Sequence, residues 1–282
     1  LFPIASVTKT FTGISIATLA AEAKCKLDDK VSLFVPAFRP QYEPYKNELT
    51  LTDVLSHRSG WKTFQGDLLN TESILSDEQL VKKLNQLRPA YPIRTKFGYS
   101  NMGFLLAGLA VKNISGLTWE AYLQQHMFTP LNMRNTFTDS SKIKASKNIC
   151  TPHTLVNGVV TPVYNKPEGP RGYGGMYSSV NDLCKWMQML LDSGRYNGAS
   201  ITPYKAIASA FNSYTIIGRQ IAADRKHYLK TYGLGWEIIQ YNGTEVIQHG
   251  GAYSGALSMF AMIPSLRCGV IILTNGDYHP LQ

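Results

Sequence analysis

The feature that most constrains the fold is a change of residue pattern along the chain. Four short runs rich in β-branched, aromatic or apolar residues occupy 235–239, 245–249, 257–263 and 269–274. Turn signals such as Asn242-Gly243 and Pro264-Ser265 separate them, which predicts an antiparallel meander. The residues before these runs carry apolar spacings of three and four, which indicate helices. A helical chain that ends in an antiparallel sheet is expected to form an α/β fold with two lobes.

The first predicted helix lies close to the N-terminus. Residues 7–23 favour helix, and their apolar positions surround most of the circumference, so this helix is expected to be buried on several sides. Further helices are predicted at 52–57, 78–86, 102–112 and 119–126, with Thr118 as an N-cap and Gly60 as the left-handed residue after 52–57. Ser179 and Asp182 resemble a capping box, and 27–38 is predicted to be a loop with a short extended piece.

The order of these elements predicts the domain organisation. Residues 1–45 and 231–282 are expected to form a discontinuous sheet lobe, an antiparallel sheet flanked by helices. Residues 46–230 are expected to form a mostly helical lobe inserted between them. A functional site is then expected in the cleft between the lobes.

Charge and composition exclude some classes of function. The formal charge of +9 is not concentrated, and the densest basic stretch, Lys142 to Lys147, lacks interleaved aromatics, so no nucleic-acid partner is predicted. No apolar run reaches the roughly 18 residues of a membrane span. The four cysteines are far apart and show no metal-ligand spacing, so we expect buried free thiols and no metal site, with disulfides left open: Cys25, Cys150, Cys184 and Cys268.

Ser6-Val-Thr-Lys9 is the first motif with chemical meaning. On a helix, residues three apart lie on one face with Cβ atoms about 5–6 Å apart, so the hydroxyl and the amine can share a proton. Burial would lower the pKa of the lysine and allow it to activate the serine. The helix start would also favour negative charge at the reacting centre. The same spacing recurs at Ser141 and Lys144 among polar residues, where a surface serine is the simpler interpretation.

Two more motifs could complete such a site. Tyr99-Ser-Asn101 precedes a predicted helix; the Tyr99 phenol can transfer a proton, and the Asn101 amide can hold a substrate carbonyl or amide. A half-buried aromatic is the alternative for Tyr99. His249-Gly-Gly251 ends a predicted strand, where glycines let a ligand approach the backbone. The N–H groups of Ala252 and Ser6 could then form an oxyanion hole, although an ordinary glycine turn would have the same sequence.

The three motifs in this order resemble the serine β-lactamase and penicillin-binding-protein superfamily, most closely its class C β-lactamases, DD-carboxypeptidases, D-aminopeptidases and related esterases. Similar stretches extend along most of the chain, at 51–60, 128–133, 174–182, 232–236 and 270–275. The resemblance implies a serine hydrolase that acts through an acyl-serine on a small-molecule or peptide substrate without a cofactor. It also favours a periplasmic or secreted location; the oligomeric state stays open.

By this resemblance, each motif residue has an expected role. Ser6 is the acylated nucleophile, Lys9 and Tyr99 transfer protons, and Asn101 contacts substrate. His249 with Gly250, Gly251 and Ala252 forms the substrate-binding strand edge. Many β-lactamases have lysine at the position of His249, so histidine shifts the expectation toward a peptidase or esterase. His57 lies in a family-like stretch and is expected to be a structural hydrogen-bonding residue.

A second departure concerns the ends of the chain. Relatives have a helix and two strands before the serine and a helix after the last strand, and these are not in the sequence. We therefore expect a piece of a longer protein, whose sheet would have an uncovered edge and face.

Two alternatives stay open from sequence. Gly98-Tyr-Ser100-Asn-Met102 approaches the nucleophile elbow of α/β-hydrolases but lacks its second glycine and a preceding parallel strand. A non-catalytic peptide or peptidoglycan binder could also keep the cleft without the chemistry.

Overall fold

The C-terminal part of the chain forms a six-stranded antiparallel sheet. The computed structural model describes residues 1–282 except 44, 70–74, 165–168, 170, 222–226 and 279–282. The strands lie in the order β12-β11-β10-β9-β8-β7, so each pairs with its neighbour in sequence. They are β7 (Thr215–Ile221), β8 (His227–Tyr232), β9 (Glu237–Tyr241), β10 (Thr244–Tyr253), β11 (Ala256–Ile263) and β12 (Cys268–Thr274). The predicted antiparallel meander is confirmed.

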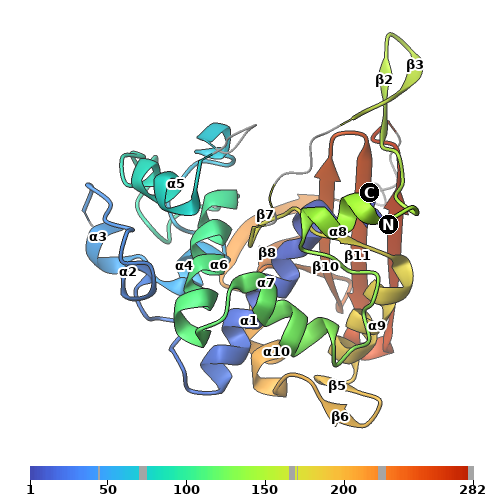
Figure 1. Ribbon diagram of the computed structural model, residues 1–282. Helices are drawn as coiled ribbons and strands as arrows, with labels where there is room; N and C mark the ends of the chain where they lie inside the picture. Colours follow the sequence, from blue (N-terminus) through green and yellow to red (C-terminus); the bar gives the residue numbers. More distant parts are fainter. Residues whose placement is uncertain (44, 70–74, 165–168, 170, 222–226, 279–282) are drawn as a thin grey trace.

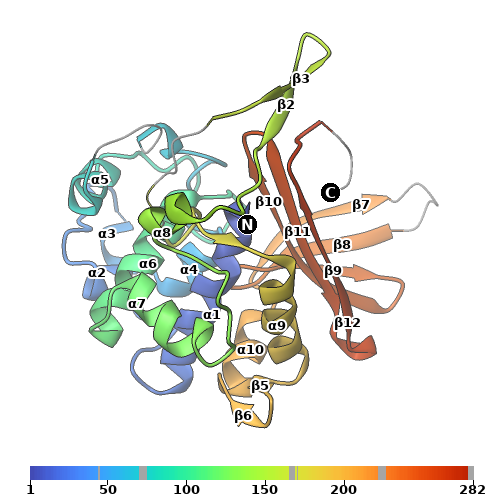
Figure 2. The ribbon, with the colours of Figure 1, turned by 45° about the vertical axis from the view of Figure 1, so that its right-hand side comes forward.

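Ten α-helices and the segments that connect them form the rest of the described residues, and the helices gather on one side of the sheet (Figure 1, Figure 2). The helices are α1 (Thr8–Ala21), α2 (Val31–Phe34), α3 (Tyr45–Glu48), α4 (Leu51–Leu55), α5 (Asp77–Leu84), α6 (Asn101–Ser115), α7 (Trp119–Leu123), α8 (Ser140–Ala145), α9 (Val180–Leu191) and α10 (Tyr204–Ala210). Short two-stranded ribbons pair β1 (Phe2–Pro3) with β4 (Tyr177–Ser178), β2 (His153–Val156) with β3 (Val159–Pro162), and β5 (Arg195–Tyr196) with β6 (Ala199–Ser200). The expected mixed α/β fold with an antiparallel sheet is confirmed.

Helix α1 is the centre of the core, as its apolar circumference predicts. Every residue from Thr8 to Leu19 is buried. Phe11 stacks on Trp186 of α9 with ring centroids 4.2 Å apart, and it meets Phe128 edge-on at 5.9 Å. Because α1 is enclosed, its first turn and the residues just before it are held rigidly between the helices and the sheet.

Three predicted elements differ in the structure. The sheet begins at Thr215, so β7 and β8 precede the predicted meander; their polar and glycine-containing sequence gave no strand signal. Residues 27–38 contain helix α2, which starts after an isolated bridge between Lys30 and Thr50. Helix α4 ends at Leu55, and the left-handed residue that follows is His57 at φ 56°, ahead of Gly60. The predicted two-lobe boundaries stay a prediction.

The capping and cysteine predictions hold only in part. Thr118 and Ser179 accept N-cap hydrogen bonds as expected. The Asp182 carboxylate, however, accepts hydrogen bonds from the Asn135 backbone and the Thr136 hydroxyl, so the helix start is tied to a neighbouring loop. All four cysteines are free thiols, but only Cys25 is buried as predicted. Cys150 is half-buried, and Cys184 on α9 and Cys268 on the edge strand β12 are exposed.

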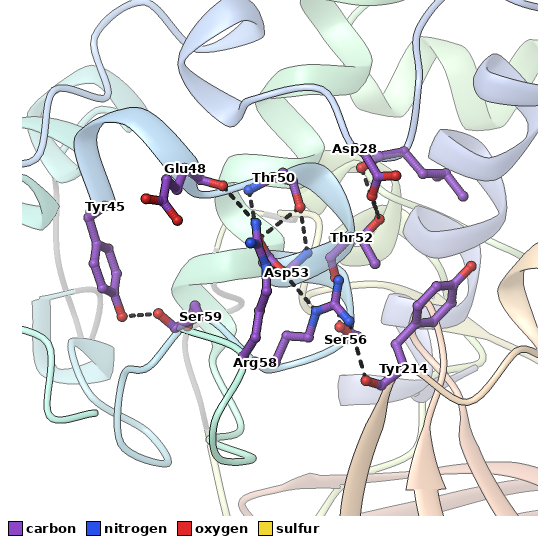
Figure 3. A network of polar contacts seen from close by, with 12 residues as sticks. Asp28, Tyr45, Glu48, Thr50, Thr52, Asp53, Ser56, Arg58, Ser59 and Tyr214 are labelled. Carbon is purple, nitrogen blue, oxygen red and sulfur yellow. Dashed lines mark hydrogen bonds and ion pairs between the residues drawn. The ribbon is translucent and has the colours of Figure 1, made fainter. Parts of the chain in front are cut away.

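A buried carboxylate organises the polar segment after α4 (Figure 3). Asp53 has no solvent exposure, and its oxygens lie 2.7 Å from Arg58 Nε and 2.9 Å from Arg94 Nη2. Thr50 adds a backbone and a hydroxyl hydrogen bond to the same carboxylate. These partners outweigh burial and lower the pKa of Asp53. We call Asp53, Thr50, Arg58 and Arg94 the Asp53 cluster. This cluster holds α4 and residues 56–59 together by charge as well as by packing.

We expect Asp53→Asn to lower the free energy of unfolding by about 3 kcal/mol, because it leaves two guanidinium groups beside a neutral amide. Urea unfolding of both proteins measures the difference. Since the folded pKa is lowered, the carboxylate stabilises the protein above its ordinary pKa, and this is lost as pH falls through the lowered one. Asp192→Asn, which breaks an exposed pair with Arg267, is the control and should cost less than about 1 kcal/mol. Equal costs would contradict the role of the cluster.

Two features are absent from the described residues. No helix there is both long and apolar enough to span a membrane. No group of three or more histidine, cysteine or acidic side chains in the same residues could hold a metal ion.

Candidate active site

Ser6 and Lys9 meet at the start of α1. A short 3-10 helix, Ala5–Val7, carries the serine directly into α1. Lys9 Nζ lies 3.1 Å from Ser6 Oγ and 3.0 Å from the carbonyl oxygen of Tyr173. The Ser-x-x-Lys spacing thus gives the contact that helical geometry predicts.

Burial changes the protonation of Lys9. The side chain has no solvent exposure, and this desolvation lowers its pKa from 10.5 to about 7, although the negative charge of Asp67 opposes the shift. The rings of Tyr99 and Phe104 lie beside the amine, with centroids 4.8 and 5.6 Å from Nζ. A neutral amine can donate one hydrogen to the Tyr173 carbonyl and direct its lone pair at the Ser6 hydroxyl.

Tyr99 joins this pair from the other side. Burial raises the pKa of its phenol well above the usual value, and the nearby Ser6 side chain acts in the opposite direction. The phenol is therefore protonated at neutral pH. Ser6, Lys9 and Tyr99 therefore lie together: Ser6 and Lys9 are hydrogen-bonded, and the Tyr99 ring lies beside the Lys9 amine.

We expect the rate of serine acylation to rise with pH around 7 and then level off. Only the neutral Lys9 amine can accept a proton, so below its pKa of about 7 the rate should fall about tenfold per pH unit. Burial lowers the pKa of His57 well below the usual 6.5 and that of His249 to about 4. Neither imidazole should therefore titrate near pH 7. Inactivation rates with a fluorophosphonate from pH 5 to 9 measure the profile. A flat profile between pH 6 and 8 would contradict the assignment of Lys9.

Asn101 lies at the N-terminus of α6, next to this group. Its Nδ2 donates to the Asp67 carboxylate at 2.7 Å, which fixes the orientation of the amide. Its Oδ1 is buried and has no hydrogen-bond partner among the described residues. A buried acceptor without a partner is costly, so it is available to a ligand N–H.

His249 is turned into the protein. Its side chain is 2% exposed; Nε2 lies 2.7 Å from the Tyr232 hydroxyl, and Nδ1 lies 2.6 Å from the Gly250 carbonyl oxygen. Burial lowers its pKa to about 4, against the opposing charge of Glu237. The imidazole is neutral at pH 7, and both ring nitrogens already have partners within the protein. Its contribution to substrate binding stays a prediction.

The second glycine after His249, Gly251, lets β10 approach the serine. A Cβ atom at Gly251 would collide with the Ile4 carbonyl and lie 3.1 Å from the Ser6 nitrogen, whereas Gly250 has room for one. The Ser258 hydroxyl on β11 ties the same place together by donating to the Ile4 carbonyl at 2.8 Å. The backbone at 250–252 therefore lies beside Ser6, with Ala252 exposed.

Sequence reasoning missed three contributors: Tyr173, Asp67 and Tyr232. Tyr173 supplies a backbone carbonyl, which no side-chain motif reveals, although a family-like stretch begins at the next residue. Asp67 begins a short 3-10 helix, Asp67–Leu69, and Tyr232 ends the strand β8; neither element was predicted.

A cavity of about 320 Å³ lies elsewhere, between α5, α6 and α7. Arg171 and Gly172 are part of its wall, while the next residue, Tyr173, faces Lys9 with its carbonyl. None of the predicted site residues lines this cavity. Ser6, Lys9 and Tyr99 lie where Tyr173 of the same turn, 171–174, contacts Lys9, and not in this cavity.

The elbow alternative does not fit this arrangement. Ser100 is buried and caps α6 by accepting a hydrogen bond from Gly103 N–H at 3.1 Å. The six-stranded sheet is antiparallel throughout. An α/β-hydrolase would require an exposed serine after a parallel strand.

An antiparallel sheet beside a buried helix that opens with Ser-x-x-Lys defines the class of serine β-lactamases and penicillin-binding proteins. The profile of the Beta-lactamase family matches residues 1–281, and the chain belongs to this family.

Known proteins share the whole of this region. The chain is 27% identical to Protein flp of Staphylococcus aureus (strain MW2) and 28% identical to Unguisins hydrolase ungD' of Aspergillus campestris (strain IBT 28561), in each case over 99% of its length. It spans about half of these relatives, 54% and 53% of their lengths.

Solved structures agree on the fold. The octameric penicillin-binding protein homologue from Pyrococcus abyssi matches 99% of this chain and 63% of its own, with a TM-score of 0.84 and 25% identity. A D-stereospecific amidohydrolase from Streptomyces sp. matches 98% of this chain and 82% of its own, with a TM-score of 0.78 and 23% identity.

Proposed function

We propose that this protein is a serine hydrolase that cleaves amide or ester bonds through an acyl-serine intermediate. The observation that carries the proposal is the 3.1 Å contact between Ser6 Oγ and a fully buried Lys9 amine. A lysine with a pKa of about 7 is an effective base at neutral pH.

The first step follows from this geometry. Ser6 Oγ attacks the substrate carbonyl while its proton moves to Lys9 Nζ, which forms a tetrahedral oxyanion. The backbone N–H groups of Ser6 and Ala252 are the proposed oxyanion donors. The closeness of Gly251 to the Ser6 nitrogen supports this pairing, because it brings the two backbone segments together.

Tyr99 is the proposed proton donor to the leaving group. Because its pKa is raised, its phenol holds a proton at pH 7, and its position near the Ser6 side chain brings that proton close to the reacting bond. When the bond to the leaving group breaks, the phenol protonates the departing nitrogen or oxygen and takes the proton held by Lys9. Water then hydrolyses the acyl-serine by the reverse sequence of proton transfers.

Asn101 favours substrates that carry an amide next to the scissile carbonyl. Its unpartnered Oδ1 can accept a substrate N–H, which a simple ester lacks. Peptides, including D-amino-acid peptides, and β-lactams with an acylamino group supply this donor. The name of the fungal relative, a hydrolase, agrees with the reaction class.

A panel of substrates tests the proposal. Steady-state rates would be measured with p-nitrophenyl esters, D-alanyl peptides and nitrocefin, on the protein with its natural flanking sequence. We expect turnover of at least one class, with an acylamino substrate preferred over an ester that lacks the N–H. If no class is turned over or forms an adduct, while a peptide binds reversibly, the protein is a non-catalytic binder and the proposal fails.

A further inference from the structure

His57 makes two hydrogen bonds that bracket Tyr99. Its backbone carbonyl accepts from Gly98 N–H at 2.8 Å, and its Nδ1 accepts from Ser100 N–H at 3.0 Å. Its ring also packs against the Tyr99 ring, with centroids 4.3 Å apart. One residue thus contacts the backbone on both sides of Tyr99 and the side chain of Tyr99 itself.

The hydrogen bond to Ser100 defines the state of the imidazole. Nδ1 can accept only if it carries no proton, so the proton lies on Nε2. Burial and the charges of Lys9 and His249 lower the pKa of His57 well below 6.5, which keeps the ring neutral. The ring also lies near the rings of Phe104 and Tyr232, with centroids 5.2 and 4.5 Å apart, so aromatic side chains pack around it.

The backbone at His57 is held in an unusual conformation. Its φ of 56° lies in the left-handed region, which histidine, asparagine and aspartate adopt more readily than other non-glycine residues. The Asp53 cluster fixes the neighbouring residue: Arg58 N–H donates to the Asp53 carbonyl, and the Arg58 carbonyl accepts from Arg94 N–H at 2.8 Å. His57 is therefore anchored independently of the segment that it holds.

The backbone just before Tyr99, at Gly98, is closely packed against Trp61. A Cβ atom at Gly98 would collide with the carbonyl oxygen of Trp61. Residues 98–101 are thus pressed against one wall while His57 accepts their N–H groups from another. The phenol of Tyr99 and the amide of Asn101 both depend on this backbone for their position.

We propose that His57 is a positioning residue that sets Tyr99 and Asn101 against Ser6 through the Ser100 N–H. The expected effect on the reaction rate rests on the proposed function, whereas the hydrogen bond from Ser100 N–H to His57 does not depend on it. His57 touches neither the serine nor the lysine through a hydrogen bond, so it acts on the reaction through Tyr99. A misplacement of about 1 Å can cost about 10²-fold in rate.

Two substitutions of equal size test the proposal. Asparagine places Oδ1 where histidine places Nδ1, two bonds beyond the Cα–Cβ bond, and it tolerates the left-handed conformation. Leucine has a similar shape without an acceptor, but it tolerates the left-handed conformation less well, so the stability of both variants is compared by urea unfolding. We expect His57→Asn to keep kcat for the preferred substrate within about fivefold and His57→Leu to lose about 30- to 100-fold, mostly in kcat rather than KM. His126→Asn, on a partly buried histidine stacked on Tyr122, should change neither parameter.

Amide hydrogen exchange gives a second readout that does not require activity. Exchange at Ser100 N–H should be slow in wild type and His57→Asn and faster in His57→Leu, measured on folded protein below its melting temperature. Unchanged Ser100 exchange in His57→Leu would overturn the proposal, as would equal loss of kcat in both variants. If wild type does not react with any substrate, the proposed function fails, while the exchange result still decides whether His57 holds this segment.

Discussion

Ser6→Ala is expected to lower hydrolysis by at least about 10⁴-fold and to abolish covalent labelling by a fluorescent penicillin or a fluorophosphonate. Removing a nucleophile from a group that works as a unit eliminates the covalent path, and only binding and oxyanion stabilisation remain. The fold should persist, because alanine removes one hydroxyl that is only partly buried.

The chain provides a matched control for this substitution. Ser141 and Lys144 have the same spacing on α8, but Ser141 is exposed and its hydroxyl donates to Asp139 at 2.7 Å. Ser141→Ala should therefore leave labelling and turnover unchanged. Labelling of Ser6→Ala at the wild-type rate would mean that another residue is the nucleophile.

Lys9→Ala is expected to lower the acylation rate by about 10³-fold, within the range that a positioned base contributes. The pH dependence near 7 should disappear with it, since the titrating amine is gone. Burst-phase kinetics with a chromogenic ester measure acylation directly.

A volume-conserving variant separates chemistry from packing. Lys9 is among the largest fully buried side chains, so alanine leaves a cavity that destabilises the protein. Lys9→Met fills the space without an amine and should be as stable as wild type, yet equally slow in acylation. Lys144→Ala is the exposed control. If Lys9→Met retained wild-type acylation, Lys9 would not be the base.

Local patterns predicted the fold well where one strong signal was present. The enclosed helix α1 and the strands β9 to β12 followed from apolar distribution and turn residues. Strands β7 and β8 were missed because Gly218 and polar residues interrupt them, and their pairing depends on neighbouring strands. The end of α4 was misplaced because a histidine, His57, already adopts the left-handed conformation ahead of Gly60, whose φ is positive as predicted.

The sequence predicted which side chains belong to the candidate site, but not the tertiary contacts and hydrogen bonds that join them. Helical spacing alone brought Ser6 to Lys9, whereas the contact of Tyr99 with them depends on the tertiary fold. The inward direction of His249 was readable from strand alternation, since Ile247 and Gly251 lie on the same buried face. The Tyr173 carbonyl and the role of His57 required coordinates, because backbone acceptors and hydrogen bonds between distant segments leave no sequence signature.

Peptide mapping by mass spectrometry after fluorophosphonate treatment tests the central claim most directly. The account predicts a stoichiometric adduct on Ser6, formed faster at pH 8 than at pH 6. An adduct on Ser100, Ser258 or another residue, with Ser6 unmodified, would contradict it.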